Sequence, residues 1–240
     1  MSWEDSVRKV VPYVAGEQPK DQDVIKLNTN ENPYPPAPEV AAVIQGFDYD
    51  ILRRYPDPDV SALVAALAGH HGLDKEQVFA GVGSDDVLSL AFLTFFTSGR
   101  PILFPDITYS FYDVWADLYR IPYEDQPLDE DFCIRKEDYF KENGGIIFPN
   151  PNAPTAIYEG LDFVEDILEH NRDVIVIVDE AYIDFAGKSA AELVGKYDNL
   201  IVVQTFSKSR SMAGMRIGYA ISNPALIKYL NDVKYSFNSY

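Results

Sequence analysis

The sequence is poor in the residues that mark several common classes of protein. Cys133 is the single cysteine among 240 residues, so no internal disulfide can form, and no cysteine and histidine group has the spacing of a structural zinc site. No apolar run approaches the roughly 20 residues that cross a bilayer, and the opening residues Met1 to Asp5 lack the layout of a signal peptide. We therefore expect a cytoplasmic protein without a metal site.

Basic residues are also scarce, because 20 lysines and arginines stand against 38 aspartates and glutamates, a formal charge of −18. A field of this sign repels nucleic acid and anionic membranes, so we expect neither as a partner. Phosphate must then be bound by locally positioned donors. His70 and His71 diverge on a helix, which predicts a solvated helix end rather than a pair of metal ligands.

Short, continuous apolar runs are what the sequence does have. Hydrophobic residues make up 47% of it, enough for one large domain with a sizeable core. Runs without period-two alternation are typical of strands buried on both faces, and the segments Asp85 to Phe96 and Leu161 to His170 have helical spacing between them. The pattern predicts an α/β architecture around a mostly parallel sheet. The runs are Val78 to Ala80, Ile102 to Phe104, Ile146 to Phe148, Val174 to Val178, Leu200 to Val203 and Ile217 to Ile221.

The residues that follow these runs are the first place to look for chemistry, because ligands of such sheets bind outside the carboxyl ends of the strands. They are Gly83 to Asp85, Asp106 to Tyr109, Asn150 to Thr155, Asp179 to Tyr182 and Thr205 to Lys208. The segment Asn28 to Pro38 differs, since four prolines and three asparagines in eleven positions forbid a regular helix. It predicts an extended arm or a cover.

Asp179 and Lys208 follow consecutive strands. An unpaired carboxylate at the end of a buried strand costs several kcal/mol, so Asp179 needs a cationic partner. It is either an ordinary cap or ion pair, or it holds a proton on a pyridine-type nitrogen. A lone lysine is usually a surface residue, but Lys208 lies one strand–helix step beyond Asp179 among small and hydroxylated residues, which favours a nucleophile toward an aldehyde.

Gly83, Ser84 and Asp85 open a predicted helix. Ser84 or Asp85 can simply be the N-cap, but the same geometry leaves free backbone N–H groups that bind phosphate. Ser207 and Arg216 can complete such an anion site, Arg216 by bidentate hydrogen bonding.

Two tyrosines are further candidates. Tyr109 is either a core residue or an aromatic plate stacked on a flat cofactor ring. Tyr182 is either a buried tyrosine or a donor to a phenolate oxygen.

Together these residues resemble the pyridoxal-phosphate (PLP) aminotransferases of fold type I, classes I and II. Ser207-Lys208 and Gly214 to Gly218 are similar to the family's lysine attachment pattern, and Asp179 to Tyr182 to its pyridine-nitrogen segment. The resemblance implies Lys208 as the catalytic, PLP-attaching lysine. It also implies a three-layer large domain over residues 46–240 with about seven strands, and an N-terminal arm and part of a small domain over residues 1–45.

The finer resemblance is to histidinol-phosphate aminotransferases. Asn28 to Tyr34 is similar to their amino-terminal segment, Val11 to Tyr13 to the start of their arm, and Arg53 to Asp57 to the segment whose tyrosine reaches the PLP phosphate of the partner subunit. This implies that Tyr13 and Asn30 bind substrate and that Tyr55 serves a homodimer with shared active sites. The implied substrates are L-histidinol phosphate and 2-oxoglutarate, in histidine biosynthesis.

Two departures from the family pattern stand out. The family usually carries Asn-Pro-Thr-Gly, whereas Ala153 here takes the place of the asparagine that contacts the phenolic oxygen, so either Asn152 substitutes or Tyr182 makes that contact alone. Family members also continue past the point that matches Tyr240, into a small domain with an arginine that binds the substrate carboxylate. We expect that domain to be absent from this chain.

Three alternatives stay open. Another enzyme of the same fold, such as a threonine-phosphate decarboxylase or an aromatic aminotransferase, would share Lys208, Asp179 and Arg216. A non-catalytic PLP-binding remnant would hold the cofactor without turnover. A nucleotide-binding module is disfavoured because the sequence lacks Gly-x-Gly-x-x-Gly and Gly-x-x-x-x-Gly-Lys-Ser/Thr.

Overall fold

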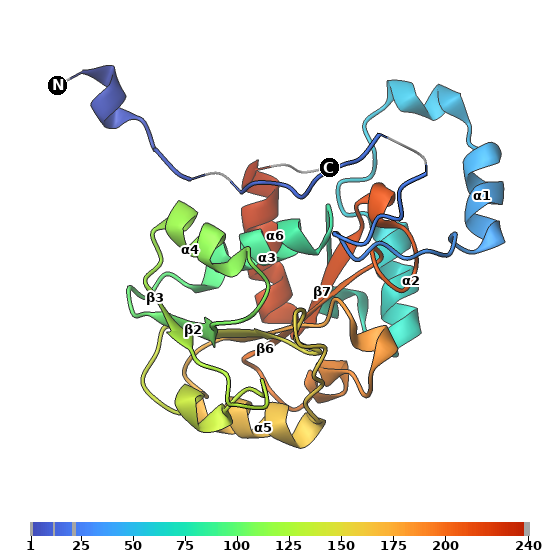
Figure 1. The fold of residues 1–240 in the computed structure, drawn as a ribbon. Helices are drawn as coiled ribbons and strands as arrows, with labels where there is room; N and C mark the ends of the chain where they lie inside the picture. The colour runs from blue at the N-terminus through green and yellow to red at the C-terminus, as the bar shows by residue number, and fades with distance from the viewer. Residues whose placement is uncertain (1, 12, 21–22, 238–240) are drawn as a thin grey trace.

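A central sheet with helices on both faces forms the body of the molecule (Figure 1). The computed structural model describes residues 2–11, 13–20 and 23–237. The sheet has seven strands in the order β1-β7-β6-β5-β4-β2-β3. They are β1 (Val78–Gly81), β2 (Ile102–Pro105), β3 (Tyr123–Gln126), β4 (Ile146–Pro149), β5 (Val176–Asp179), β6 (Leu200–Thr205) and β7 (Gly218–Ser222). All pairs are parallel except those of β7, which runs antiparallel to β1 and β6.

The six apolar runs of the sequence all form strands, which confirms the predicted α/β architecture with a mostly parallel sheet. β2, β4, β5, β6 and β7 are buried along their whole length, as expected for continuous apolar runs. The remaining strand, β3, was missed because three of its four residues are polar. It can be polar because it lies at the edge of the sheet, paired only with β2.

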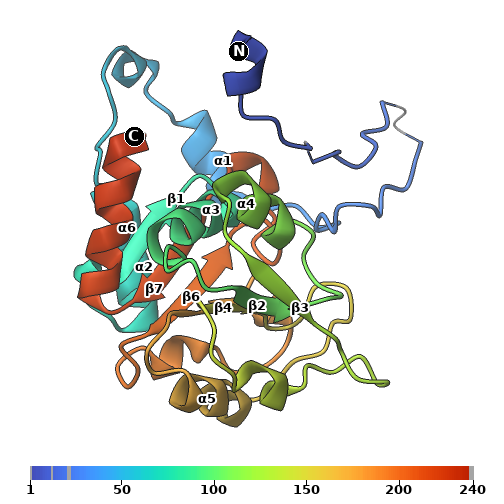
Figure 2. The ribbon, with the colours of Figure 1, turned by 90° about the vertical axis from the view of Figure 1, so that its left-hand side faces the viewer.

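Helices cover the sheet as two layers, so the domain has three layers (Figure 2). One core cluster joins α3 (Ser84–Phe95), α4 (Tyr112–Tyr119) and α6 (Pro224–Phe237) to the face that carries Ile177. The other joins α2 (Ser61–His71) and α5 (Leu161–His170) to the face that carries Val176. The 3-10 helices are η1 (Trp3–Ser6), η2 (Tyr49–Arg53), η3 (Lys75–Gln77), η4 (Lys136–Tyr139), η5 (Ile183–Phe185), η6 (Ala190–Leu193) and η7 (Ala213–Met215).

The amino-terminal segment runs outside this body as an arm (Figure 1). Its residues are mostly exposed, and Asn28 to Ala37 form no regular helix, as predicted. α1 (Pro38–Gln45) begins at Pro38, because a first-turn proline lacks only an N–H that the helix leaves unpaired in any case. Among the described residues, no helix combines the length and apolar character that spanning a membrane requires.

Candidate active site

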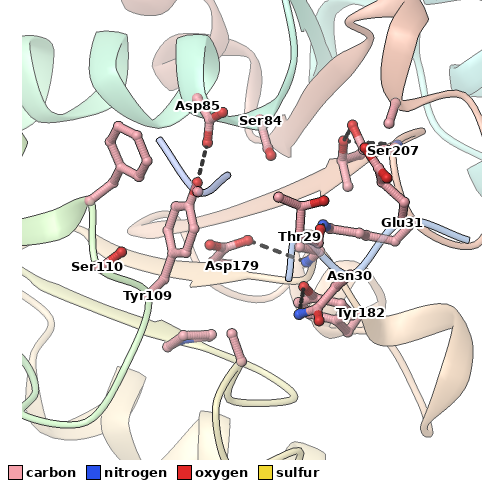
Figure 3. Close-up of a pocket in the computed structure, with 18 of the residues that line it drawn as sticks. Thr29, Asn30, Glu31, Ser84, Asp85, Tyr109, Ser110, Asp179, Tyr182 and Ser207 are labelled. Atoms are coloured by element: carbon pink, nitrogen blue, oxygen red, sulfur yellow. Dashed lines mark hydrogen bonds between the residues drawn. The ribbon is translucent and has the colours of Figure 1, made fainter. Parts of the chain in front are cut away.

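A cavity of about 760 Å³ opens at the carboxyl ends of the parallel strands, where Pro149, Asp179 and Thr205 end β4, β5 and β6. It gathers ten of the twelve residues proposed from the sequence (Figure 3). These are Tyr13, Asn30, Ser84, Asp85, Tyr109, Asp179, Tyr182, Ser207, Lys208 and Arg216. The two others, Asn152 and Tyr55, do not line it.

Asp179 is the buried acid of the cavity. Its side chain is held by two donors, the hydroxyl of Tyr112 at 2.8 Å from Oδ2 and the N–H of Ala181 at 3.2 Å from Oδ1. The residue is 4% exposed, and in the described part of the chain no lysine or arginine forms an ion pair with it. Burial raises the pKa of Asp179 to about 6, although the two donors and Lys208 act in the opposite direction. A cationic N–H in the cavity would supply the missing partner.

Backbone and side-chain donors converge at one end of the cavity, at the start of α3. Gly83 precedes this helix with φ +91°, and a Cβ there would lie 2.4 Å from Nη2 of Arg216. A Cβ on Gly218 would lie 2.2 Å from the backbone nitrogen of Ser84, so β7 meets the helix start backbone to backbone. The first N–H groups of a helix have no partner inside it. With Arg216 beside them, these N–H groups have the arrangement expected of an anion site, and we call this group of donors the candidate anion site.

Two side chains complete this end of the cavity. The carboxylate of Asp85 lies 3.4 Å from Nη2 of Arg216 and accepts the hydroxyl of Tyr109 at 2.8 Å. Ser207 follows the carboxyl end of β6, and its Oγ lies 3.0 Å from Oγ1 of Thr205. The arginine and the tyrosine are thus held at fixed places around the anion site.

Aromatic rings form one wall of the cavity. Tyr109 stacks on Phe111 with centroids 5.4 Å apart, and Tyr13 from the arm packs on the same Phe111 at 4.1 Å. Burial, with the adjacent Asp85, raises the pKa of Tyr109, which keeps its hydroxyl a donor. The wall places flat apolar surface beside the acid and the anion site.

Lys208 reaches the cavity from the turn after β6. Its Nζ donates to the backbone oxygen of Thr29 at 3.0 Å and lies 5.5 Å from the centre of the Tyr182 ring. Asn30 donates to the hydroxyl of Tyr182 at 3.0 Å. The arm therefore covers the lysine and the tyrosine together.

Asn152 and Tyr55 lie apart from this group. The amide of Asn152 is used in contacts with the loop after β2, where it donates to the oxygen of Ile107 at 2.9 Å and accepts from Thr108 at 3.1 Å. Ala153 lines the cavity in its place. Tyr55 follows η2 and is 84% exposed. The roles of both residues stay predictions.

Three residues of the site were missed in the sequence. Tyr112 supports Asp179, Thr29 holds Lys208 through its backbone oxygen, and Asn32 donates to the backbone oxygen of Lys208 at 3.0 Å. Tyr112 begins α4 three residues after Tyr109, so the search of the segment after β2 would have reached it if it had been carried slightly further. His70 and His71 do end a helix, but the end is solvated only in part: His70 is exposed, whereas His71 is half-buried and its Nε2 lies 3.1 Å from the hydroxyl oxygen of Tyr219. The described residues include no group of three or more potential metal ligands.

Comparisons with known proteins agree with this geometry. The family model for aminotransferase class I and II matches residues 22–239. The histidinol-phosphate aminotransferase of Lactococcus lactis subsp. cremoris is 55% identical over 240 residues, which are 100% of this chain and 67% of the relative. Histidinol-phosphate aminotransferase 1 of Methylococcus capsulatus is 56% identical over 238 residues, with 99% and 67% covered.

A solved structure shows the same fold. Histidinol-phosphate aminotransferase from Sinorhizobium meliloti, in complex with pyridoxal-5'-phosphate, matches with a TM-score of 0.80 at 24% identity, over 88% of this chain and 59% of that one. The chain thus spans about two thirds of the curated relatives and less of this structure. The resemblance seen in the motifs is confirmed, and the chain belongs to the aminotransferase class I and II family.

Proposed function

We propose that this chain carries the cofactor site of a PLP-dependent aminotransferase that moves an amino group between L-histidinol phosphate and 2-oxoglutarate, a step of histidine biosynthesis in the cytoplasm. The observation that carries the proposal is the meeting of Lys208 with Asp179 and an anion site in one cavity. Identity of 55% over the whole chain to a histidinol-phosphate aminotransferase supports the choice of substrate.

The residues fit PLP at each of its polar groups. Asp179 is buried without a cationic partner in the described chain, so it suits the ring nitrogen. Arg216 and the start of α3 suit the phosphate, and the glycine contact between β7 and α3 leaves no Cβ there. Lys208 suits the aldehyde. When bound, PLP supplies an electron sink for the negative charge that develops on the substrate carbon.

The chain's own groups then have distinct tasks. Asp179, oriented by Tyr112 and Ala181, keeps a proton on the ring nitrogen. The Nζ of Lys208 is positioned to take a proton from the substrate carbon and return it, as a general base and acid. Tyr182 donates toward the phenolic oxygen, the contact that Ala153 cannot make.

Two parts of the proposal concern assembly. Tyr55 reaches the phosphate site of a partner subunit in a homodimer, which its exposure on this chain permits. Tyr13 and Asn30 line the cavity and contact the substrate from the arm. Residues 1–45 form the arm with part of the small domain, and residues 46–240 form the PLP-binding domain.

Borohydride trapping tests cofactor and lysine together. The purified chain is mixed with PLP, reduced with borohydride and digested, and the labelled peptide is identified by mass. We expect the label on Lys208 and none on a Lys208→Arg control. A colourless protein, or a label on another lysine, would refute the proposal.

Amino donors are then compared. Histidinol phosphate, threonine phosphate and phenylalanine are added in turn to the PLP-loaded chain, and loss of its visible absorbance is followed. Histidinol phosphate should react fastest. A faster reaction with threonine phosphate or phenylalanine would identify another enzyme of this fold, and a stable band with all three would identify a non-catalytic PLP-binding protein.

A further inference from the structure

The turn that carries Lys208 is held in place from outside. The Ser211 N–H donates to the backbone oxygen of Lys208 at 3.2 Å and closes the turn, and Ser211 has φ +56°, a left-handed conformation that is unfavourable for a non-glycine residue. A turn under such strain persists only where its surroundings determine it. The contacts around it therefore decide where Lys208 lies.

Asp184 contacts this turn from η5. It accepts the hydroxyl of Ser209 and lies 3.4 Å from Nη1 of Arg210, so it binds the two residues that directly follow Lys208. Arg210 is anchored in turn, because it donates to the backbone oxygen of Thr205 at 3.3 Å, at the end of β6. One carboxylate thus holds the two residues after Lys208, and Arg210 links them to the end of β6.

Asp184 also belongs to the other cofactor segment. It lies in η5, two residues after Tyr182, whose ring lies 5.5 Å from the Nζ of Lys208. In PLP the aldehyde and the phenolic oxygen are on adjacent ring atoms. Lys208 and Tyr182 must therefore keep a fixed spacing, and Asp184 ties their two segments together beside the cavity.

We propose that Asp184 is a positioning residue that sets the place of the Lys208 amine relative to the Tyr182 hydroxyl. This rests on the proposed function. Its side chain is 41% exposed, and that of Arg210 is 26% exposed. An ion pair this exposed contributes little to the stability of a fold, so a purely structural role predicts little effect on the site.

The test compares Asp184→Ala, Asp184→Asn and the control Asp232→Asn. Asp232 forms a comparable exposed ion pair with Lys228 at 2.5 Å on α6, and neither residue lines the cavity. Two quantities are measured on each PLP-loaded protein: the pH midpoint of the visible band and the rate of its loss with saturating histidinol phosphate.

Asp184→Ala should shift the midpoint by about half a pH unit and slow the reaction about tenfold, less than the about hundredfold cost of an ångström-scale misplacement. Asp184→Asn keeps an acceptor for Ser209, so its midpoint and its rate should lie between those of Asp184→Ala and those of the unaltered chain. Asp232→Asn should match the unaltered chain. If Asp184→Ala matches Asp232→Asn in both quantities, Asp184 has no positioning role. If the unaltered chain gives no band, the proposed function itself has failed.

Discussion

Replacing Asp179 with asparagine tests the charge at the centre of the site. Burial raises the pKa of Asp179 from 3.8 to about 6, so the folded chain holds this proton more tightly than the unfolded chain. The stability gained from the proton is complete below pH 3.8 and is lost as the pH rises through about 6. Each pKa unit corresponds to about 1.4 kcal/mol, so the loss is about 3 kcal/mol.

Asp179→Asn removes this loss in the cofactor-free chain. At pH 8 the variant should be more stable than the unaltered chain by about 2 kcal/mol, because about 1 kcal/mol is forfeited when the amide no longer accepts from the Ala181 N–H. At pH 4 the two proteins should be nearly equal. Burial also raises the pKa of Glu180, to about 7, and the neighbouring charge of Asp179 adds to that rise, so the part due to burial cancels in the difference and the part due to Asp179 does not.

Urea unfolding at pH 4 and pH 8, without PLP, measures the effect. Asp232→Asn serves as the exposed control and should show no such pH dependence. With excess PLP the order at pH 8 should reverse, because the ionised carboxylate gains the ring N–H as a partner. If Asp179→Asn is no more stable at pH 8 than at pH 4, relative to the unaltered chain, the acid is not an uncompensated buried charge.

Three further substitutions test other parts of the site. Tyr112→Phe removes a donor that lowers the pKa of Asp179, so the pH-dependent loss of unfolding free energy should extend to higher pH in the same urea experiments. An unchanged pH dependence would show that the hydrogen bond from Tyr112 to Asp179 is weak. Gly218→Ala puts a Cβ 2.2 Å from the backbone at the start of α3 and should cost about 1–3 kcal/mol and weaken PLP binding, whereas Gly195→Ala, in open space, should be neutral. Ala156→Gly should stabilise the chain by about 1 kcal/mol in a urea titration, since Ala156 has φ +58°, and a destabilised variant would contradict that view.

The sequence predicted the sheet and most of the cavity for one physical reason. Strands buried on both faces must be apolar throughout, and ligands meet at their carboxyl ends, so Asp179 and Lys208 could be placed before their contacts were known. β3 escaped because an edge strand needs no apolar run.

Contacts between distant segments were beyond the sequence patterns. Thr29 holds Lys208 through a backbone oxygen, which any residue supplies, so its identity carries no signal. The amide of Asn152 is occupied by Ile107 and Thr108, which follow β2, and this contact between two separate loops has no sequence pattern. The domain division at residues 45 and 46 and the partner role of Tyr55 stay predictions.

The reversed direction of β7 has a consequence for how the site is assembled. β7 runs antiparallel to β1 and pairs Gly218 with Gly81. The two sides of the candidate anion site therefore come from residues far apart in the chain. Pairing over such a distance is intrinsically slow, because the entropy of loop closure is lost before the contacts form. The cofactor site is complete only when β1 and β7 have paired, so a substitution that weakens this pairing would disrupt the site from a distance.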